Sequence, residues 1–186
     1  MSLHLEIVTP KGKALSALAD EVTAPSIAGE IGVLPGHVPL LTALRTGLVS
    51  YKKAGETKLC AVGAGFAEAI DDKVILLTDE FAEKEHIDPV LVHKELAERQ
   101  AEFEKAQAKG DLEGGGKDDP EMRSLIARMN WLVTELELYG EPPVAIVRLL
   151  EESGARTPSD QDPNVYVEDA DEEDGANDEG EKEANQ

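Results

Sequence analysis

Four side chains near the middle of the chain are of types that bind metal ions: His86, Asp88, His93 and Glu95. The two histidines are seven positions apart on or beside an expected helix, so they face similarly but lie about two turns, or roughly 10 Å, apart. At that separation they cannot share one ion. We therefore interpret the group as solvated side chains near a helix start, and we expect no metal site.

A short glycine run has the spacing of a dinucleotide-binding turn, in which Gly63 and Gly65 would be the first two glycines. However, Glu68 stands where a third small residue belongs, and the residues that follow are typical of a strand. A tight strand connection explains these glycines better. The sequence also contains no phosphate-binding loop, zinc-protease motif or nucleophile elbow. We expect no catalytic residue and no cofactor.

Composition excludes further classes of protein. The 186 residues carry a net charge of −21, of which −12 falls in residues 141–186. This charge argues against nucleic-acid binding, which needs clustered Lys and Arg. No apolar run approaches the roughly 20 residues that span a bilayer, and the N-terminus lacks the regions of a secretory signal. We expect no nucleic-acid partner and no direct membrane insertion.

Cys60 is the only cysteine, so an intramolecular disulfide is excluded. Its thiol could be reactive, or it could serve as a small hydrophobe on a strand. We favour the second interpretation, because free cysteines are commonly buried.

Residues 1–86 have the period-2 alternation and the turn spacing of a small β-sandwich. Leu48–Lys52 and Lys58–Val62 flank one expected hairpin turn. Phe66–Ile70 and Lys73–Thr78 flank a second, tighter one at Asp71-Asp72.

Residues 87–140 change to a helical period. Asp88-Pro89 and Asp119-Pro120 are helix starts, with Asp as N-cap and Pro at the first position. The first helix is expected to fade at Gly110, and Gly140 is expected to follow the end of the second. The second helix carries an apolar stripe made of Met122, Leu125, Ile126, Met129, Leu132, Val133 and Leu136.

Residues 141–186 are expected to form a short helix over 144–153 and then a disordered acidic tail. The sequence therefore predicts an α+β fold with three parts: an N-terminal antiparallel β-sandwich (1–86), a C-terminal antiparallel two-helix hairpin (87–140) and the tail. The stripe should dock on the sandwich or on a partner, because so small a hairpin is marginal alone.

Residues 29–41 read G-E-I-G-V-L-P-G-H-V-P-L-L, which indicates a shaped loop rather than a linker. Leu34-Pro35-Gly36-His37 fits a type II turn. Glu30 is expected to project into solvent, either as a contact residue or as a solvated turn charge. His37 is a partner contact or only a turn residue, and the sequence leaves both open.

This run closely resembles the signature of the epsilon subunit of F-type ATP synthases. Three further segments resemble the same family: Leu5–Gly12, Val62–Glu68, and Val74–Ala82 followed by Ile87-Asp88. The resemblance covers about residues 1–138. It implies a ten-stranded β-sandwich followed by two antiparallel helices.

The resemblance implies a non-catalytic central-stalk subunit of a proton-translocating rotary ATP synthase, which couples the gamma subunit to the c ring during ATP synthesis. By similarity, Glu30 meets the polar loops of the c ring, His37 lies in the same region, and Val8-Thr9-Pro10 lies near gamma. The subunit would be peripheral, on the cytoplasmic side of the cell inner membrane. In the family the helices can also extend toward the catalytic alpha and beta subunits and restrain ATP hydrolysis.

Two departures from the family affect regulation. Some members bind ATP through an I-D-x-x-R-A pattern, but Leu91 and Val92 replace the Arg and Ala here, so we expect no tight ATP binding. The acidic tail could disfavour the extended helices or could be only solubilising. Two other functions stay open on the residues alone: a free-standing regulatory module with a helical switch, and a small hydrolase with an unrecognised site.

Overall fold

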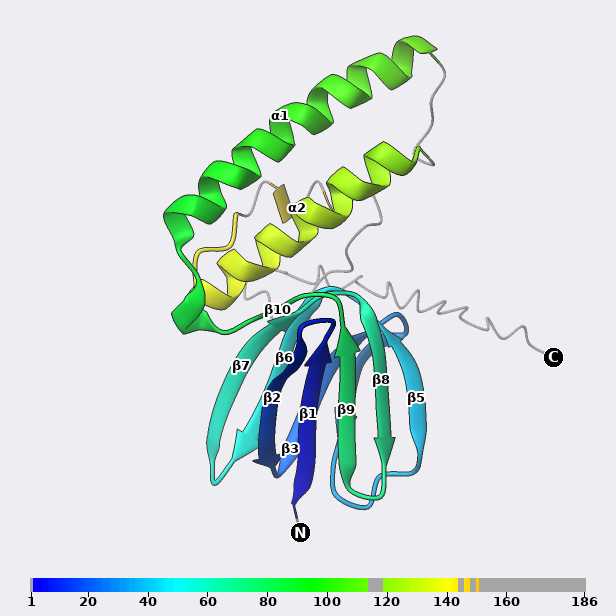
Figure 1. The fold of residues 1–186 in the computed structure, drawn as a ribbon, viewed down its shortest axis with the longest axis vertical. Coiled ribbons are helices and arrows are strands. Elements are labelled where there is room, and N and C mark those ends of the chain that lie inside the picture. The colour runs from blue at the N-terminus through cyan, green and yellow to red at the C-terminus, as the bar shows by residue number, and fades with distance from the viewer. Residues whose placement is uncertain (1, 114–118, 144–145, 148–149, 151–186) are drawn as a thin grey trace, which may run out of the picture.

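The computed structural model describes residues 2–113, 119–143, 146–147 and 150, with the side chains of 109–113 excepted. In this part of the chain, ten strands precede one 3-10 turn and two helices (Figure 1). The elements are β1 (Leu3–Thr9), β2 (Gly12–Ala19), β3 (Glu21–Ser26), β4 (Gly29–Val33), β5 (Leu40–Leu44), β6 (Gly47–Lys53), β7 (Glu56–Val62), β8 (Gly65–Ile70), β9 (Lys73–Thr78), β10 (Phe81–Ala82), η1 (Lys84–His86), α1 (Pro89–Glu113) and α2 (Pro120–Tyr139).

The strands form a sandwich with the helical hairpin at one end (Figure 1). The strand order is β10-β7-β6-β3-β5-β8-β9-β1-β2, with β4 added beside β3. The sheet folds over at the single β3–β5 pair, Ser26 with Leu44, so β5-β8-β9-β1-β2 forms one layer and β10-β7-β6-β3 the other. We call the end that carries the helices the helical end and the opposite one the far end.

One strand pair departs from the antiparallel arrangement that the sequence predicts. β1 and β9 run parallel, from His4 beside Lys73 to Val8 beside Leu77. The period-2 pattern could not indicate this, because alternation is the same in either direction and a parallel pair needs a long crossover connection.

Both predicted hairpins are confirmed. β6 and β7 are joined at Ala54-Gly55, and β8 and β9 at Asp71-Asp72. All four turn residues have φ between 48° and 85°, as a type I′ turn requires.

The inward-facing residues of both layers form one core cluster, which includes Leu3, Leu5, Ile7, Val22, Val49, Cys60, Val62, Val74 and Leu76. Cys60 is 1% exposed, which confirms the interpretation of a buried strand residue. Burial raises the pKa of its thiol to about 12, because the apolar surroundings disfavour the thiolate.

The predicted helix starts are also confirmed. Asp88 Oδ1 accepts a hydrogen bond of 3.0 Å from Val90 N, and Asp119 Oδ1 accepts one of 2.9 Å from Glu121 N. Gly140 ends α2 with a φ of 105°. The predicted end of α1 is wrong, since the helix continues past Gly110 to Glu113. One interior glycine costs only about 1 kcal/mol, which ordinary helix formers around it can offset.

The C-terminal half of α2 is buried on nearly all sides, not only along the predicted stripe. Asn130, Trp131 and Thr134 lie off the stripe and are also buried. A second cluster joins α2 to the sandwich and to α1 through Ala61, Ala82, Ile87, Val92, Leu96, Phe103, Met129, Leu132, Val133 and Leu136. Docking of the stripe on the sandwich is therefore confirmed.

Part of the predicted C-terminal helix is visible. Residues 146, 147 and 150 are helical, and Leu150 is buried in the second cluster, with Ile146 and Val147 packed against it. The predicted acidic tail lies outside the described residues.

The glycines at 63 and 65 serve a tight strand connection, as expected. The Thr78 hydroxyl lies 3.0 Å from both Gly63 O and Glu80 O, which brings the β7–β8 connection against the start of β10. A Cβ atom on Gly65 would lie 1.9 Å from the carbonyl oxygen of Leu77.

We predict that Gly65→Ala lowers the free energy of unfolding by about 1–3 kcal/mol, because the backbone must shift to relieve this overlap. Gly32→Ala is the matched control, since a Cβ atom on Gly32 meets nothing within 4 Å. Urea denaturation of both variants checks the prediction. Equal stability of the two would contradict it.

Candidate interaction surfaces

The run from Gly29 to Leu41 is not one loop. Residues 29–33 form β4, which pairs with β3. The type II turn is confirmed, because His37 N donates a 3.0 Å hydrogen bond to Leu34 O and Gly36 has a φ of 79°. Gly36 N also donates to Asp72 Oδ1 at 2.7 Å, which holds the turn against the β8–β9 hairpin at the far end.

Glu30 lies on a strand, opposite Pro25, and is exposed. The tip of this hairpin is Ile27-Ala28, with Ile27 66% exposed, so the expectation that Glu30 lies in a loop is wrong, whereas its exposure is confirmed. This tip lies toward the helical end. The register shows it, because Ser26 pairs with Leu44, Leu44 with Gly65, and Gly65 with Thr78, at the end of β9 that adjoins the helices.

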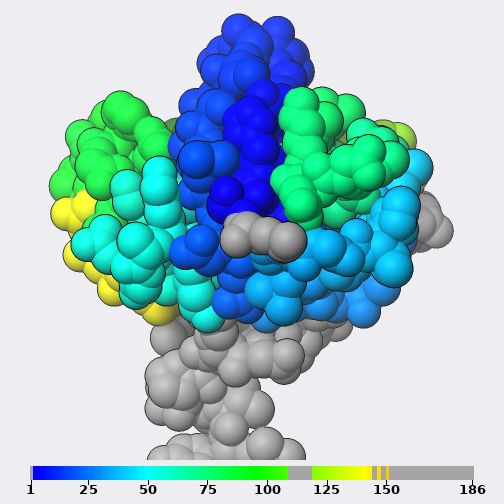
Figure 2. All heavy atoms as spheres, turned by 90° about the horizontal axis from the view of Figure 1, so that it is seen from below, coloured from blue at the N-terminus to red at the C-terminus, as the bar shows by residue number. Residues whose placement is uncertain are grey.

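His37 lies at the other end of β4, in the turn beside Asp72. The extended chain from Glu30 to Leu34 spans roughly 13 Å, so the two residues lie toward opposite ends of β4, and which partner each of them meets stays a prediction. His37 is exposed, and its Nδ1 lies 2.7 Å from Val38 O. Figure 2 views the far end, where the light-blue segment around residues 35–45 adjoins the green β8–β9 hairpin.

Val8, Thr9 and Pro10 lie at the helical end, since Val8 pairs with Leu77. Thr9 lines a hollow of about 390 Å³ between the β1–β2 turn and α2. The other lining residues are Lys11, Gly12, Lys13, Ala14, Asp79, Glu80, Phe81, Trp131 and Glu135.

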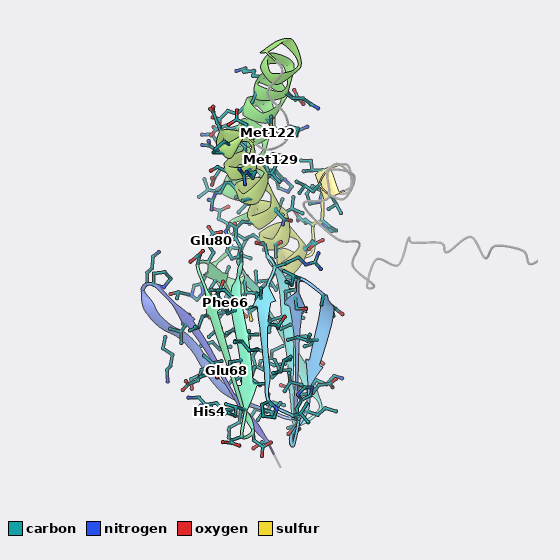
Figure 3. All side chains as sticks on the ribbon, turned by 90° about the vertical axis from the view of Figure 1, so that its right-hand side faces the viewer. His4, Phe66, Glu68, Glu80, Met122 and Met129 are labelled. Carbon is teal, nitrogen blue, oxygen red and sulfur yellow. The ribbon has the colours of Figure 1, made fainter. Side chains whose placement is uncertain are left out.

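The face of β5-β8-β9-β1 that points away from the core is unusually apolar. One cross-strand row reads Ala43, Phe66, Leu77, Val8, and the next reads Leu41, Glu68, Ile75, Glu6. Phe66 is 58% exposed, Leu77 50% and Leu41 73%. We call these eight residues the outer sheet face. Figure 3 shows Phe66 and Glu68 along β8, below the helices.

Sequence reasoning missed this surface, although a signal was present. Val74–Leu77 is apolar at four consecutive positions, and such a run is typical of a strand covered on both faces. Val74 and Leu76 enter the core, so Ile75 and Leu77 must face the other side. An exposed apolar sheet face of this kind marks an interaction site.

The two carboxylates of this face differ in their surroundings. Lys13 Nζ lies 2.6 Å from one oxygen of Glu6, and Lys73 Nζ lies 3.0 Å from the other. Hydrogen bonds from Lys13 and Lys73 lower the pKa of Glu6 to about 2. Glu68, by contrast, has no hydrogen bond or ion pair with any residue that the structure describes.

Arg128 joins three elements at the junction of helices and sandwich. Its Nε and Nη2 donate to the two oxygens of Glu95 on α1, at 2.7 and 2.9 Å. Its Nη1 donates at 3.0 Å to Glu80, between β9 and β10, which Figure 3 shows beneath α2. The hydrogen bond from Arg128 lowers the pKa of Glu95, whereas burial raises the pKa of Glu80 and Glu135 against the attraction of Arg128.

Leu91 and Val92, at the positions of the ATP-binding pattern, line a second hollow of about 240 Å³. Its lining includes three acids and one cation, Arg128, which is already paired; the full set is His86, Ile87, Asp88, Leu91, Val92, Glu95, Arg128, Leu132 and Glu135. A polyphosphate would meet net negative charge here. The absence of tight ATP binding stays a prediction.

The histidines near this hollow contact different partners. His86 Nδ1 lies 3.7 Å from Glu83, and His93 Nε2 lies 3.4 Å from Glu141. Over the described ranges, no three His, Cys, Asp or Glu side chains are grouped as metal ligands. None of the helices described is long and apolar enough to cross a membrane.

Comparison with known proteins gives consistent matches. The model of the β-sandwich domain of ATP synthase delta/epsilon chains matches residues 2–84. ATP synthase epsilon chain 2 of Syntrophotalea carbinolica is 37% identical over 127 residues, which is 68% of this chain and 87% of that protein. The epsilon chain of Nitratidesulfovibrio vulgaris (strain Miyazaki F) is 48% identical over 87 residues, which is 47% of this chain and 65% of that protein, slightly less than two thirds of its length.

A solved structure shares the fold. A chain of the Euglena gracilis mitochondrial ATP synthase, in a cryo-EM structure of OSCP, F1 and the c ring, superposes with a TM-score of 0.57 at 21% identity. The match covers 73% of this chain and 79% of that one.

A sandwich with an exposed apolar sheet face indicates a protein that works by contact with other chains. The epsilon-chain matches agree with that class over both the strands and the helices. The chain belongs to the ATP synthase epsilon chain family. It is accordingly a non-catalytic subunit of that enzyme, and membership supports a role in the rotor stalk.

We predict that Arg128→Ala lowers the free energy of unfolding by about 1–2 kcal/mol and speeds hydrogen exchange in α2, because Glu80 and Glu95 lose their shared cation. Arg99→Ala is the control, since Arg99 pairs with Glu102 within α1 at 2.6 Å and should cost about 0.3 kcal/mol. Unchanged exchange in α2 of the Arg128 variant would show that this cation does not hold the junction.

Proposed function

We propose that this chain is a central-stalk rotor subunit of a proton-translocating F-type ATP synthase, which couples the gamma subunit to the c ring. The observation that carries the proposal is the outer sheet face, an apolar surface on a layer whose other side already packs the core. A rotor contact needs a stiff surface of this kind. It also needs no reactive group, since the coupling is mechanical.

The gamma subunit is the proposed partner of the outer sheet face. Four strands support it, and hydrogen-bonded pairs fix the position of each apolar residue. Val8-Thr9-Pro10 continues this surface toward the helical end. Large apolar side chains on a rigid sheet are favourable anchors for a stable interface.

The c ring is the proposed partner of the β3–β4 hairpin. β4 pairs only with β3 among the described strands, so its other edge offers backbone groups beside the exposed Glu30 and Gly32. An exposed carboxylate and free backbone donors suit polar loops better than an apolar partner. His37, at the far end, belongs to a separate part of the surface and is a second proposed contact.

The helical hairpin gives a means of regulation. In the described position it is held by the second cluster and by Arg128. Only after release from both could it extend toward the catalytic alpha and beta subunits and restrain ATP hydrolysis.

We place the subunit at the cytoplasmic side of the cell inner membrane, bound through its partners rather than inserted.

We predict that Phe66→Ser weakens binding to the gamma subunit of the same organism by at least about 10-fold, the loss typical of a central aromatic anchor. Leu59→Ser is the matched control, since Leu59 is an exposed apolar residue on β7 in the other layer. Titration calorimetry with purified gamma measures both. Failure of the wild-type chain to bind gamma would favour a free-standing regulatory module.

We predict that Glu30→Lys weakens coupling of ATP hydrolysis to proton pumping in the reconstituted complex, while circular dichroism stays that of the wild type. Glu56→Lys is the control, because Glu56 is an exposed strand carboxylate beside the β6–β7 turn. A Glu30 variant that fails to fold would give this residue a structural role instead. Normal pumping by a folded variant would remove it from the c-ring contact.

A further inference from the structure

Glu68 lies on β8 in the second row of the outer sheet face. Its direct neighbours across the strands are Leu41 on β5 and Ile75 on β9. Along β8, Phe66 and Ile70 share its face, because alternate residues of a strand point the same way. Lys73, which pairs with Ile70, is its diagonal neighbour on β9, and the other side chains next to the carboxylate on this face are apolar.

The basic side chains of the same face already contact groups other than Glu68. Lys13 and Lys73 both bind Glu6, and His4 Nε2 lies 3.1 Å from the Ser16 hydroxyl. Glu6 lies two strands away from Glu68, roughly 10 Å at the usual strand spacing. Within the described chain, Glu6 is therefore neutralised by its neighbours and Glu68 is not.

A partner that covers this face takes Glu68 out of water. A carboxylate buried without a counter-charge loses its hydration, which makes such burial strongly unfavourable unless a cation and hydrogen bonds replace the water. Lys73, the nearest cation of the face, is already paired with Glu6, and turning it to Glu68 would leave Glu6 with Lys13 alone. A cation brought by the partner would neutralise Glu68 without breaking that pair.

We infer that the partner bound on the outer sheet face places a basic side chain, preferably an arginine, on Glu68. The inference rests on the proposed function, in which that partner is gamma. Arginine suits the site because its planar fork can bind both carboxylate oxygens. Phe66, about 7 Å along the same strand, offers a ring on which the guanidinium can stack.

The test compares Glu68→Gln, Glu68→Lys and the control Glu56→Gln in the full chain, by titration calorimetry against purified gamma at low and high salt. Glu68→Gln should weaken binding at least about 10-fold, since it leaves a buried cation unpaired, and should reduce the salt dependence. Glu68→Lys should weaken binding further. Glu56→Gln should bind within about twofold of wild type.

A charge-reversal scan of gamma completes the test. One Lys→Glu or Arg→Glu variant of gamma should restore binding to the Glu68→Lys chain, and that residue is then the partner cation. If Phe66→Ser weakens binding but Glu68→Gln does not, the ion pair is refuted while the proposed function stands. If the wild-type chain does not bind gamma, both are refuted.

Discussion

The two parts of this molecule are joined by the burial of the C-terminal half of α2. Met129, Leu132, Val133 and Leu136 pack between α1 and the strands β6 and β7. Two helices of this size are marginal in water without such packing, so the sandwich is what makes the hairpin stable. Two polar interactions lie around this apolar contact and fix its orientation. They are the hydrogen bonds of Arg128 and the cation–π contact of Lys84 with Tyr139, 5.7 Å from Nζ to the ring centroid.

Features set by neighbouring residues could be predicted from the sequence. Asp88 and Asp119 cap helices because a side chain meets a backbone N–H two positions on, and Asp71-Asp72 turns because both residues adopt positive φ. Glu30 was harder to place. Glycines and prolines around it indicated a loop. Residues 29–33 nevertheless form a strand, because β3 pairs with them. The residue types of this segment do not predict that pairing.

Features set by distant packing could not be predicted in the same way. The parallel pairing of β1 with β9, and the burial of the C-terminal half of α2 on nearly all sides, depend on which segments meet in space. In the sequence, Arg128 is one of two basic residues of the second helix, and only the fold brings Glu80 and Glu95 to it. The outer sheet face is an intermediate case, since the apolar run in β9 already indicated a strand covered on both sides.

The parallel pair also sets an order for biosynthesis. β1 lies between β2 and β9, and only β2 follows it directly in the chain. On the ribosome, β1 keeps one unpaired edge until Thr78 has emerged, on the order of several seconds later at usual elongation rates. During that interval the N-terminal hairpin exposes the apolar side of Leu3, Leu5 and Ile7, which makes it the segment most exposed to aggregation and to chaperone capture. The helices emerge only after all ten described strands.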